Sequence, residues 1–165
     1  MKTYEQIFRY AMQMELDGHN FYKEKASSLN NPTSFKMFMD LAEVEMEHYK
    51  YIERQLNNYI EKNSLDINLD IESKEGSIFE SREESEHIEE TLNESDIPDL
   101  TILRMAYLIE RDYKEFYQNA ATNIEDLEVK KIFEKLAKWE EGHETIFKAE
   151  YDKRMREYIN LPWGG

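Results

Sequence analysis

Two segments of eleven residues decide how this chain folds: F38-MDLAEVEME-H48 and, 95 residues later, F133-EKLAKWEEG-H143. In both, a phenylalanine, a leucine–alanine pair, a glutamate and a histidine stand at the same spacing. The apolar members recur every three or four residues, which is the period of an amphipathic helix. Glu45 and His48 are three residues apart, as are Glu140 and His143, so each pair lies on the apolar face about one turn apart.

The repeat extends well beyond these segments. Aligned without a gap at the same offset, the window Ile7–His48 has 14 identities in 42 residues. The residues that recur 95 positions later are Ile7, Arg9, Ala11, Glu15, Asp17, Phe21, Tyr22, Ala26, Lys36, Phe38, Leu41, Ala42, Glu45 and His48. They include two glutamates and a histidine in each half, which the packing of amphipathic helices does not require. The chain is therefore predicted to contain a duplicated helical hairpin.

Four long helices are predicted. Five glycines and three prolines in 165 residues favour helices over a strand-and-turn architecture. The first helix starts near residue 3 and continues to Leu29, and the second runs from Pro32 to about Lys62 with Asn31 as its N-cap. The third helix begins near Asp99. The fourth follows a break at residues 123–126 and runs to about Ile159.

An acidic connection, residues 63–98, separates the two hairpins. From 64 to 98 it has 12 acidic and 2 basic residues, so it carries −10 of the net charge of −15. Its 36 residues can travel the length of a helix of about 30 residues, which is ~45 Å. Within it, Phe79–Leu92 is predicted as a short amphipathic helix. We predict one all-α domain over 1–165, a four-helix bundle of hairpins at about 3–62 and 99–160.

Composition excludes several classes of protein. The chain has no cysteine, which excludes a disulfide framework, a thiolate nucleophile and cysteine-ligated zinc or iron–sulfur sites. The net charge of −15 repels phosphate backbones, so we expect no nucleic-acid partner. We expect no membrane partner either, because no apolar run approaches the ~20 residues that cross a bilayer. The N-terminus turns polar and acidic at once, unlike a secretory signal, so a cytoplasmic protein is expected.

A cluster of buried carboxylates and imidazoles follows from the helical pattern. Glu15 and Glu110 occupy the inner face of the first and third helices, as the two Glu-x-x-His pairs do on the second and fourth. Four carboxylates and two imidazoles are thus predicted to point into one core, where unpaired charges would cost several kcal/mol each. Two divalent cations would balance the four negative charges, and this donor set suits iron, manganese or zinc.

These residues resemble the ferritin-like di-iron carboxylate superfamily, and more closely its rubrerythrin-like branch. The resemblance rests on A11-x-x-x-E15, F21-Y22-x-x-x-A26, F38-x-x-L41-A42-x-x-E45-x-x-H48 and their copies, and it covers about 3–60 and 99–150. It implies six metal ligands: Glu15, Glu45, His48, Glu110, Glu140 and His143. It further implies that Glu45 and Glu140 bridge the two ions and that Glu15 and Glu110 are terminal. Tyr22 and Tyr117 are expected to donate hydrogen bonds to ligand carboxylates.

The chain departs from the rubrerythrin pattern in two ways. Members with peroxidase activity carry another glutamate three residues after the third-helix ligand, where this chain has Tyr113 and, at the duplicate position, Gly18. The four cysteines of a rubredoxin-like module are also absent, so a separate electron-donor protein is expected.

The resemblance implies a di-iron oxidoreductase that reduces hydrogen peroxide or O₂, as a peroxidase or ferroxidase. Such an enzyme can work as a monomer or a homodimer. Two alternatives stay open at this stage. One is a non-catalytic iron-binding or storage module within a shell of many subunits. The other is a structural bundle held together by zinc or manganese.

Overall fold

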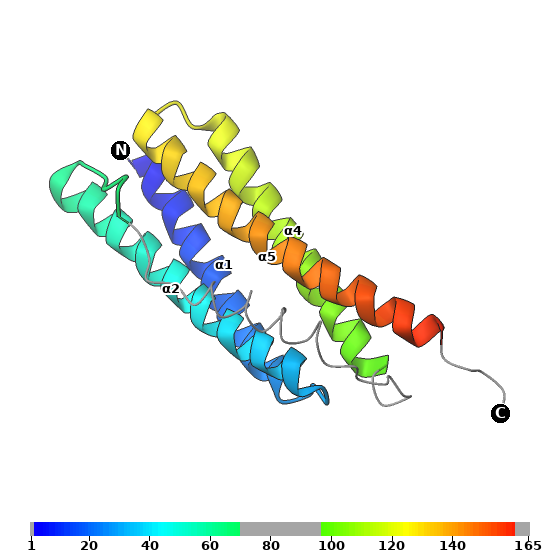
Figure 1. Ribbon diagram of the computed structural model, residues 1–165. Helices are drawn as coiled ribbons and strands as arrows, with labels where there is room; N and C mark the ends of the chain where they lie inside the picture. Colours follow the sequence, from blue (N-terminus) through cyan, green and yellow to red (C-terminus); the bar gives the residue numbers. More distant parts are fainter. Residues whose placement is uncertain (1, 70–96, 161–165) are drawn as a thin grey trace.

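The computed structural model describes residues 2–69 and 97–160, and these residues form a four-helix bundle (Figure 1). The helices are α1 (Lys2–Ala26), α2 (Pro32–Lys62), α4 (Ile97–Asn123) and α5 (Leu127–Ile159). Helix α1 packs closely on α2, and α4 on α5, so the bundle consists of two helical hairpins. The predicted all-α bundle of two hairpins is confirmed.

The positions of the helix ends explain why the connection between the two hairpins is long. The α1–α2 turn and the α4–α5 turn lie at opposite ends of the bundle, and α2 ends at the end opposite to the start of α4 (Figure 1). The chain between the hairpins must therefore travel the length of the bundle. The helix predicted at 79–92 lies outside the described residues.

Side-chain caps begin the second helix of each hairpin. The Asn31 side chain accepts hydrogen bonds from the backbone N–H groups of Thr33 and Ser34, and Pro32 occupies the first turn, as predicted. In the other hairpin the Asp126 side chain accepts from the N–H groups of Glu128 and Val129. At the end of α2, Asn63 adopts a left-handed φ of 49° and closes the helix with a hydrogen bond to the Tyr59 carbonyl.

Two predicted boundaries are wrong by two or three residues. Helix α1 ends at Ala26 rather than Leu29, because the next N–H groups make short turn bonds and those of Asn30 and Asn31 donate to the Asp99 carboxylate at 3.0 and 2.8 Å. Helix α4 begins at Ile97 rather than near Asp99. A proline at the second position is tolerated there, since first-turn N–H groups have no helical acceptor.

Two apolar clusters form the core, one on each side of a polar layer. One contains Phe8, Ile52, Tyr117 and Phe133, and the other contains Tyr22, Phe38, Leu103 and Phe147. Along every helix the residues between the two clusters include the glutamates and histidines singled out above. No helix in the described part of the chain is long and apolar enough to span a membrane.

Candidate metal centre

Six polar side chains from all four helices meet in the layer between the apolar clusters. Each is at most 2% exposed, which is unusual for glutamate. They are the six predicted ligands: Glu15 on α1, Glu45 and His48 on α2, Glu110 on α4, and Glu140 and His143 on α5. The structure thus brings together every metal ligand that the sequence nominated.

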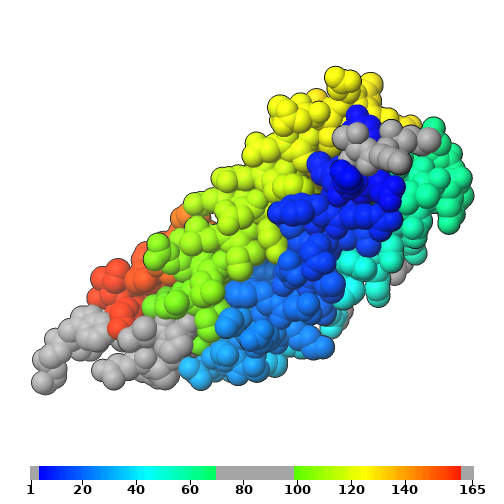
Figure 2. All heavy atoms as spheres, turned by 180° about the vertical axis from the view of Figure 1, so that it is seen from behind, coloured from blue at the N-terminus to red at the C-terminus, as the bar shows by residue number. Residues whose placement is uncertain are grey.

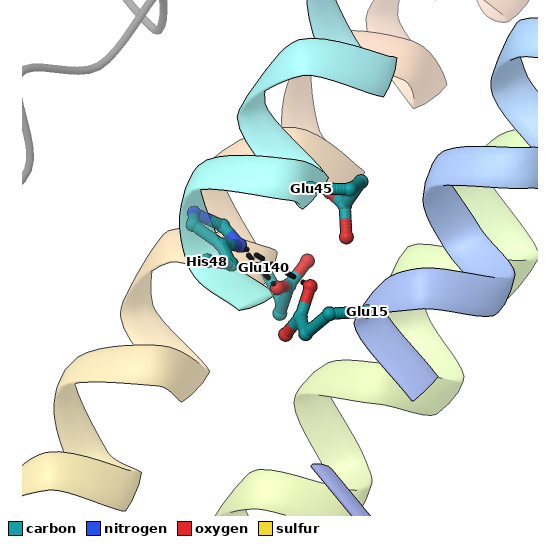
Figure 3. Close-up of side chains that lie close together, drawn as sticks. All are labelled: Glu15, Glu45, His48 and Glu140. Carbon is teal, nitrogen blue, oxygen red and sulfur yellow. Dashed lines mark hydrogen bonds and ion pairs between the residues drawn. The ribbon is translucent and has the colours of Figure 1, made fainter. Parts of the chain in front are cut away.

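The six side chains form two overlapping groups. Glu15 and His48 belong to one group and Glu110 and His143 to the other, while Glu45 and Glu140 belong to both. Within each group one ligand atom per residue lies within 4.8 Å of the others, close enough for one cation. Figure 3 shows the first group, with the carboxylates of α1, α2 and α5 pointing toward one another beside the His48 ring. Two shared carboxylates are the arrangement that a bridged pair of ions requires.

The two imidazole rings face the carboxylates edge-on. His48 Nδ1 lies 3.1 Å from Glu140 Oε1 and 3.4 Å from Glu15 Oε2 (Figure 3). His143 Nδ1 lies 3.3 Å from Glu140 Oε2 and 3.4 Å from Glu110 Oε2. The rings themselves stack at a centroid distance of 5.4 Å and an angle of 10°. Glu140 therefore lies between the two histidines.

The electrostatics of the cluster favour the binding of cations. Burial raises the pKa of Glu45 and of Glu110 well above the ordinary value, and repulsion from Glu140 adds to it. Burial would also raise the pKa of Glu140, but hydrogen bonds from Glu110 and both histidines hold it well below the ordinary value. If all four carboxylates are ionised, even two charged histidines offset only two of the negative charges.

Several carboxylate oxygens of the cluster accept no hydrogen bond from the described part of the chain, which also favours the binding of cations. Among the described residues, no hydrogen bond reaches either carboxylate oxygen of Glu45, the Oε2 of Glu15 or the Oε2 of Glu110. A buried carboxylate oxygen without a donor is costly, and a buried carboxylate is commonly satisfied by a metal ion. The residues therefore fit a pair of divalent cations with oxygen and nitrogen donors.

Two buried tyrosines tie the outer glutamates across the hairpins. Tyr22 on α1 donates its hydroxyl hydrogen to Glu110 Oε1 on α4, and Tyr117 on α4 donates to Glu15 Oε1 on α1. Burial, reinforced by the neighbouring carboxylates, raises the pKa of both phenols, so each is a neutral donor. The predicted donation is present, and each bond crosses to the opposite hairpin.

One aromatic contact had no signal in the sequence. The Trp139 ring stacks on His48 with centroids 4.8 Å apart and an angle of 17°. Lys135 Nζ lies 5.4 Å from the centroid of the Trp139 ring. The position equivalent to Trp139 in the first half is Val44. The residue four positions before the histidine is therefore aromatic in one half and aliphatic in the other.

Comparison with known proteins agrees with this geometry. The family model described as Rubrerythrin matches residues 6–151. The chain belongs to the rubrerythrin family. No curated protein and no solved structure gives a significant match. All six residues of the candidate centre lie within the part that the rubrerythrin family model covers.

Proposed function

We propose that this member of the rubrerythrin family is a di-iron oxidoreductase that uses hydrogen peroxide or O₂ as its oxidant. One observation carries the proposal: two groups of buried ligands share Glu45 and Glu140. One structural ion would require only one of these two groups of ligands. A site that transfers two electrons at once gains from a second ion held close to the first.

The residues of each half would hold one ion apiece. Glu15 and His48 would be the terminal ligands of one ion, and Glu110 and His143 those of the other. Glu45 and Glu140 would span both ions. Tyr22 and Tyr117 hold the outer carboxylates in place through their hydrogen bonds, which fixes the direction in which Glu110 and Glu15 present their remaining oxygen.

The oxidant receives two electrons in the proposed reaction. When bound, two iron(II) ions can give up one electron each, and these two electrons reduce one hydrogen peroxide, which takes up two protons, to two molecules of water. The apolar clusters on both sides keep bulk water away from the six side chains. We propose that a separate protein returns the two electrons.

The donor chemistry favours iron over a structural metal. Structural zinc sites are usually closed tetrahedra rich in sulfur and nitrogen, whereas four of the six donors here are carboxylates. Manganese accepts the same hard donors, and zinc accepts them less readily. A storage role would need a cage of many subunits, which native mass measurement of the purified protein distinguishes from a monomer or a homodimer.

Metal loading followed by oxidant tests the proposal. The metal-free protein should bind two iron(II) per chain under anaerobic conditions, and one equivalent of peroxide should oxidise both. The variant Glu45→Ala/Glu140→Ala should bind less iron and lose peroxide consumption. Its matched control is Glu43→Ala/Glu141→Ala, which removes exposed glutamates of the same helices and should behave as wild type. Unchanged peroxide consumption in the Glu45/Glu140 variant would defeat the proposal.

A further inference from the structure

One tyrosine beside the centre has no part in the function proposed above. Tyr113 on α4 is half-buried. Helices α4 and α1 lie side by side on the face shown in Figure 2. The Tyr113 hydroxyl donates a hydrogen bond of 2.8 Å to the Met14 carbonyl on α1. The side chain therefore bridges the two helices that contribute the outer glutamates.

Tyr113 lies next to Gly18, the equivalent residue of the first half of the repeat. Gly18 stands 95 residues before Tyr113, so the two occupy equivalent places in the repeat. A Cβ atom on Gly18 would lie 3.2 Å from Tyr113 Cε2 and 3.4 Å from its hydroxyl oxygen. Contacts this short require the neighbour to move, so the tyrosine ring fills the space that a side chain at Gly18 would need.

The same space borders the carboxylates. The Cβ position on Gly18 lies 3.3 Å from Oε2 of Glu45, a residue shared by both groups of ligands. Burial raises the pKa of Tyr113, and the negative charges of all four carboxylates of the centre add to the rise. Glu45 is buried whereas Tyr113 is partly exposed, so the Tyr113 side chain borders the space next to the Glu45 carboxylate and also reaches the surface.

We propose that Tyr113, accommodated by Gly18, is a specificity-determining residue that closes the α1–α4 side of the centre. This inference rests on the proposed function, because it takes the six side chains to hold metal ions. Hydrogen peroxide and O₂ are small enough to pass a packed ring through ordinary side-chain fluctuations. A bulky hydroperoxide or a chelator must displace the ring and break its hydrogen bond to Met14.

Cobalt(II) is a suitable probe, because its visible spectrum reports binding without any turnover. In cobalt-loaded protein, Tyr113→Ala should speed removal of the metal by EDTA at least tenfold and leave the equilibrium affinity for cobalt within about threefold of wild type. Tyr113→Phe keeps the ring and loses one ordinary hydrogen bond, so a rise of at most about fivefold is expected. Tyr107→Ala is the matched control, since Tyr107 is a half-buried tyrosine of α4 whose ring packs on Tyr151.

Gly18 supplies an independent arm. Gly18→Ala should also speed removal of the metal, because its methyl group crowds the Tyr113 ring and forces the ring to shift. The double variant Gly18→Ala/Tyr113→Ala should then be no faster than Tyr113→Ala, since the two changes act through one contact. Additive effects would overturn the inference.

Substrate preference separates a barrier from a merely structural role. With iron-loaded protein, the ratio of the rate with cumene hydroperoxide to the rate with hydrogen peroxide should rise at least tenfold in Tyr113→Ala. An unchanged ratio together with unchanged cobalt removal would overturn the inference while leaving the proposed function intact. Failure of the wild-type protein to hold cobalt or iron would instead count against the proposed function. If Tyr113→Ala does not fold, Tyr113→Leu gives a smaller opening and the same direction of change.

Discussion

Removal of the Tyr117 hydroxyl should weaken the binding of one metal ion and spare the other. Tyr117 and Glu15 are both fully buried, and the phenol donates to Glu15 Oε1. Tyr117→Phe deletes one oxygen without opening a sizeable cavity. Glu15 then keeps its contact with His48 Nδ1, which lies 3.4 Å from the other carboxylate oxygen.

The size of the effect follows from the charge of the acceptor. A hydrogen bond to an ionised group contributes about 1.5–3 kcal/mol, and about 1.4 kcal/mol corresponds to a tenfold change in affinity. Without the phenol, the Glu15 carboxylate is less well oriented. We therefore expect the ion at Glu15 and His48 to bind about 10–100-fold more weakly, and the ion at Glu110 and His143 to change by less than about threefold.

A competition titration with cobalt(II) and a coloured chelator measures both binding constants. Tyr22→Phe should give the mirror result, because Tyr22 donates to Glu110 instead. Tyr59→Phe is the matched control, a buried tyrosine near the end of α2, where its ring meets Tyr4 and Phe8. The reasoning is refuted if Tyr117→Phe weakens both ions equally, or if it has no more effect than Tyr59→Phe.

Three further outcomes are expected. Burial and repulsion from Glu140 raise the pKa of Glu45 and Glu110, so the folded metal-free protein retains protons that the unfolded chain has lost, and its melting temperature should fall as the pH rises from about 4.5 toward neutrality. Glu45→Gln should flatten this fall, and a melting temperature that rises over the same range in wild type would contradict it. Trp139→Val makes the position match Val44 of the first half and removes the ring stacked on His48. It should lower the affinity of the ion held by His48 several-fold in the same cobalt titration, whereas equal loss at both ions would argue for general destabilisation. Asp99→Ala leaves the N–H groups of Asn30 and Asn31 without their acceptor, so urea unfolding should show a loss of about 1–3 kcal/mol. A loss below about 0.5 kcal/mol would show that solvent replaces the carboxylate.

Local spacing was sufficient to place the candidate ligands on the inner faces of their helices. Which face a residue occupies depends only on its neighbours three and four positions away, so Glu45 and His48 could be assigned to the core without knowledge of the other helices. The 95-residue repeat then paired them with Glu140 and His143. The structure brings these four together with the two outer glutamates.

Contacts between helices were beyond that reasoning. The hydroxyl of Tyr22 reaches Glu110 of the other hairpin, and the Trp139 indole reaches His48, because of the axial offset and rotation of one helix against another. Neither quantity is encoded in the spacing within a single helix. The end of α1 was misplaced for a related reason, since the N–H groups that leave the helix there bond to Asp99, which is 69 positions away from Asn30.

The two halves of the repeat have different residues at the equivalent positions Gly18 and Tyr113, which lie next to each other. A ligand can be duplicated freely, because each copy lies on its own side of the axis that relates the halves. A residue that packs against its own duplicate can be repeated only where both side chains fit, as the stacked rings of His48 and His143 do. Tyr113 lies beside Gly18, and the short distances to a Cβ on Gly18 show that a side chain there would crowd the tyrosine ring. Glycine in one half is therefore the physical consequence of a ring in the other, and a centre with paired ligands acquires a cover from one hairpin only.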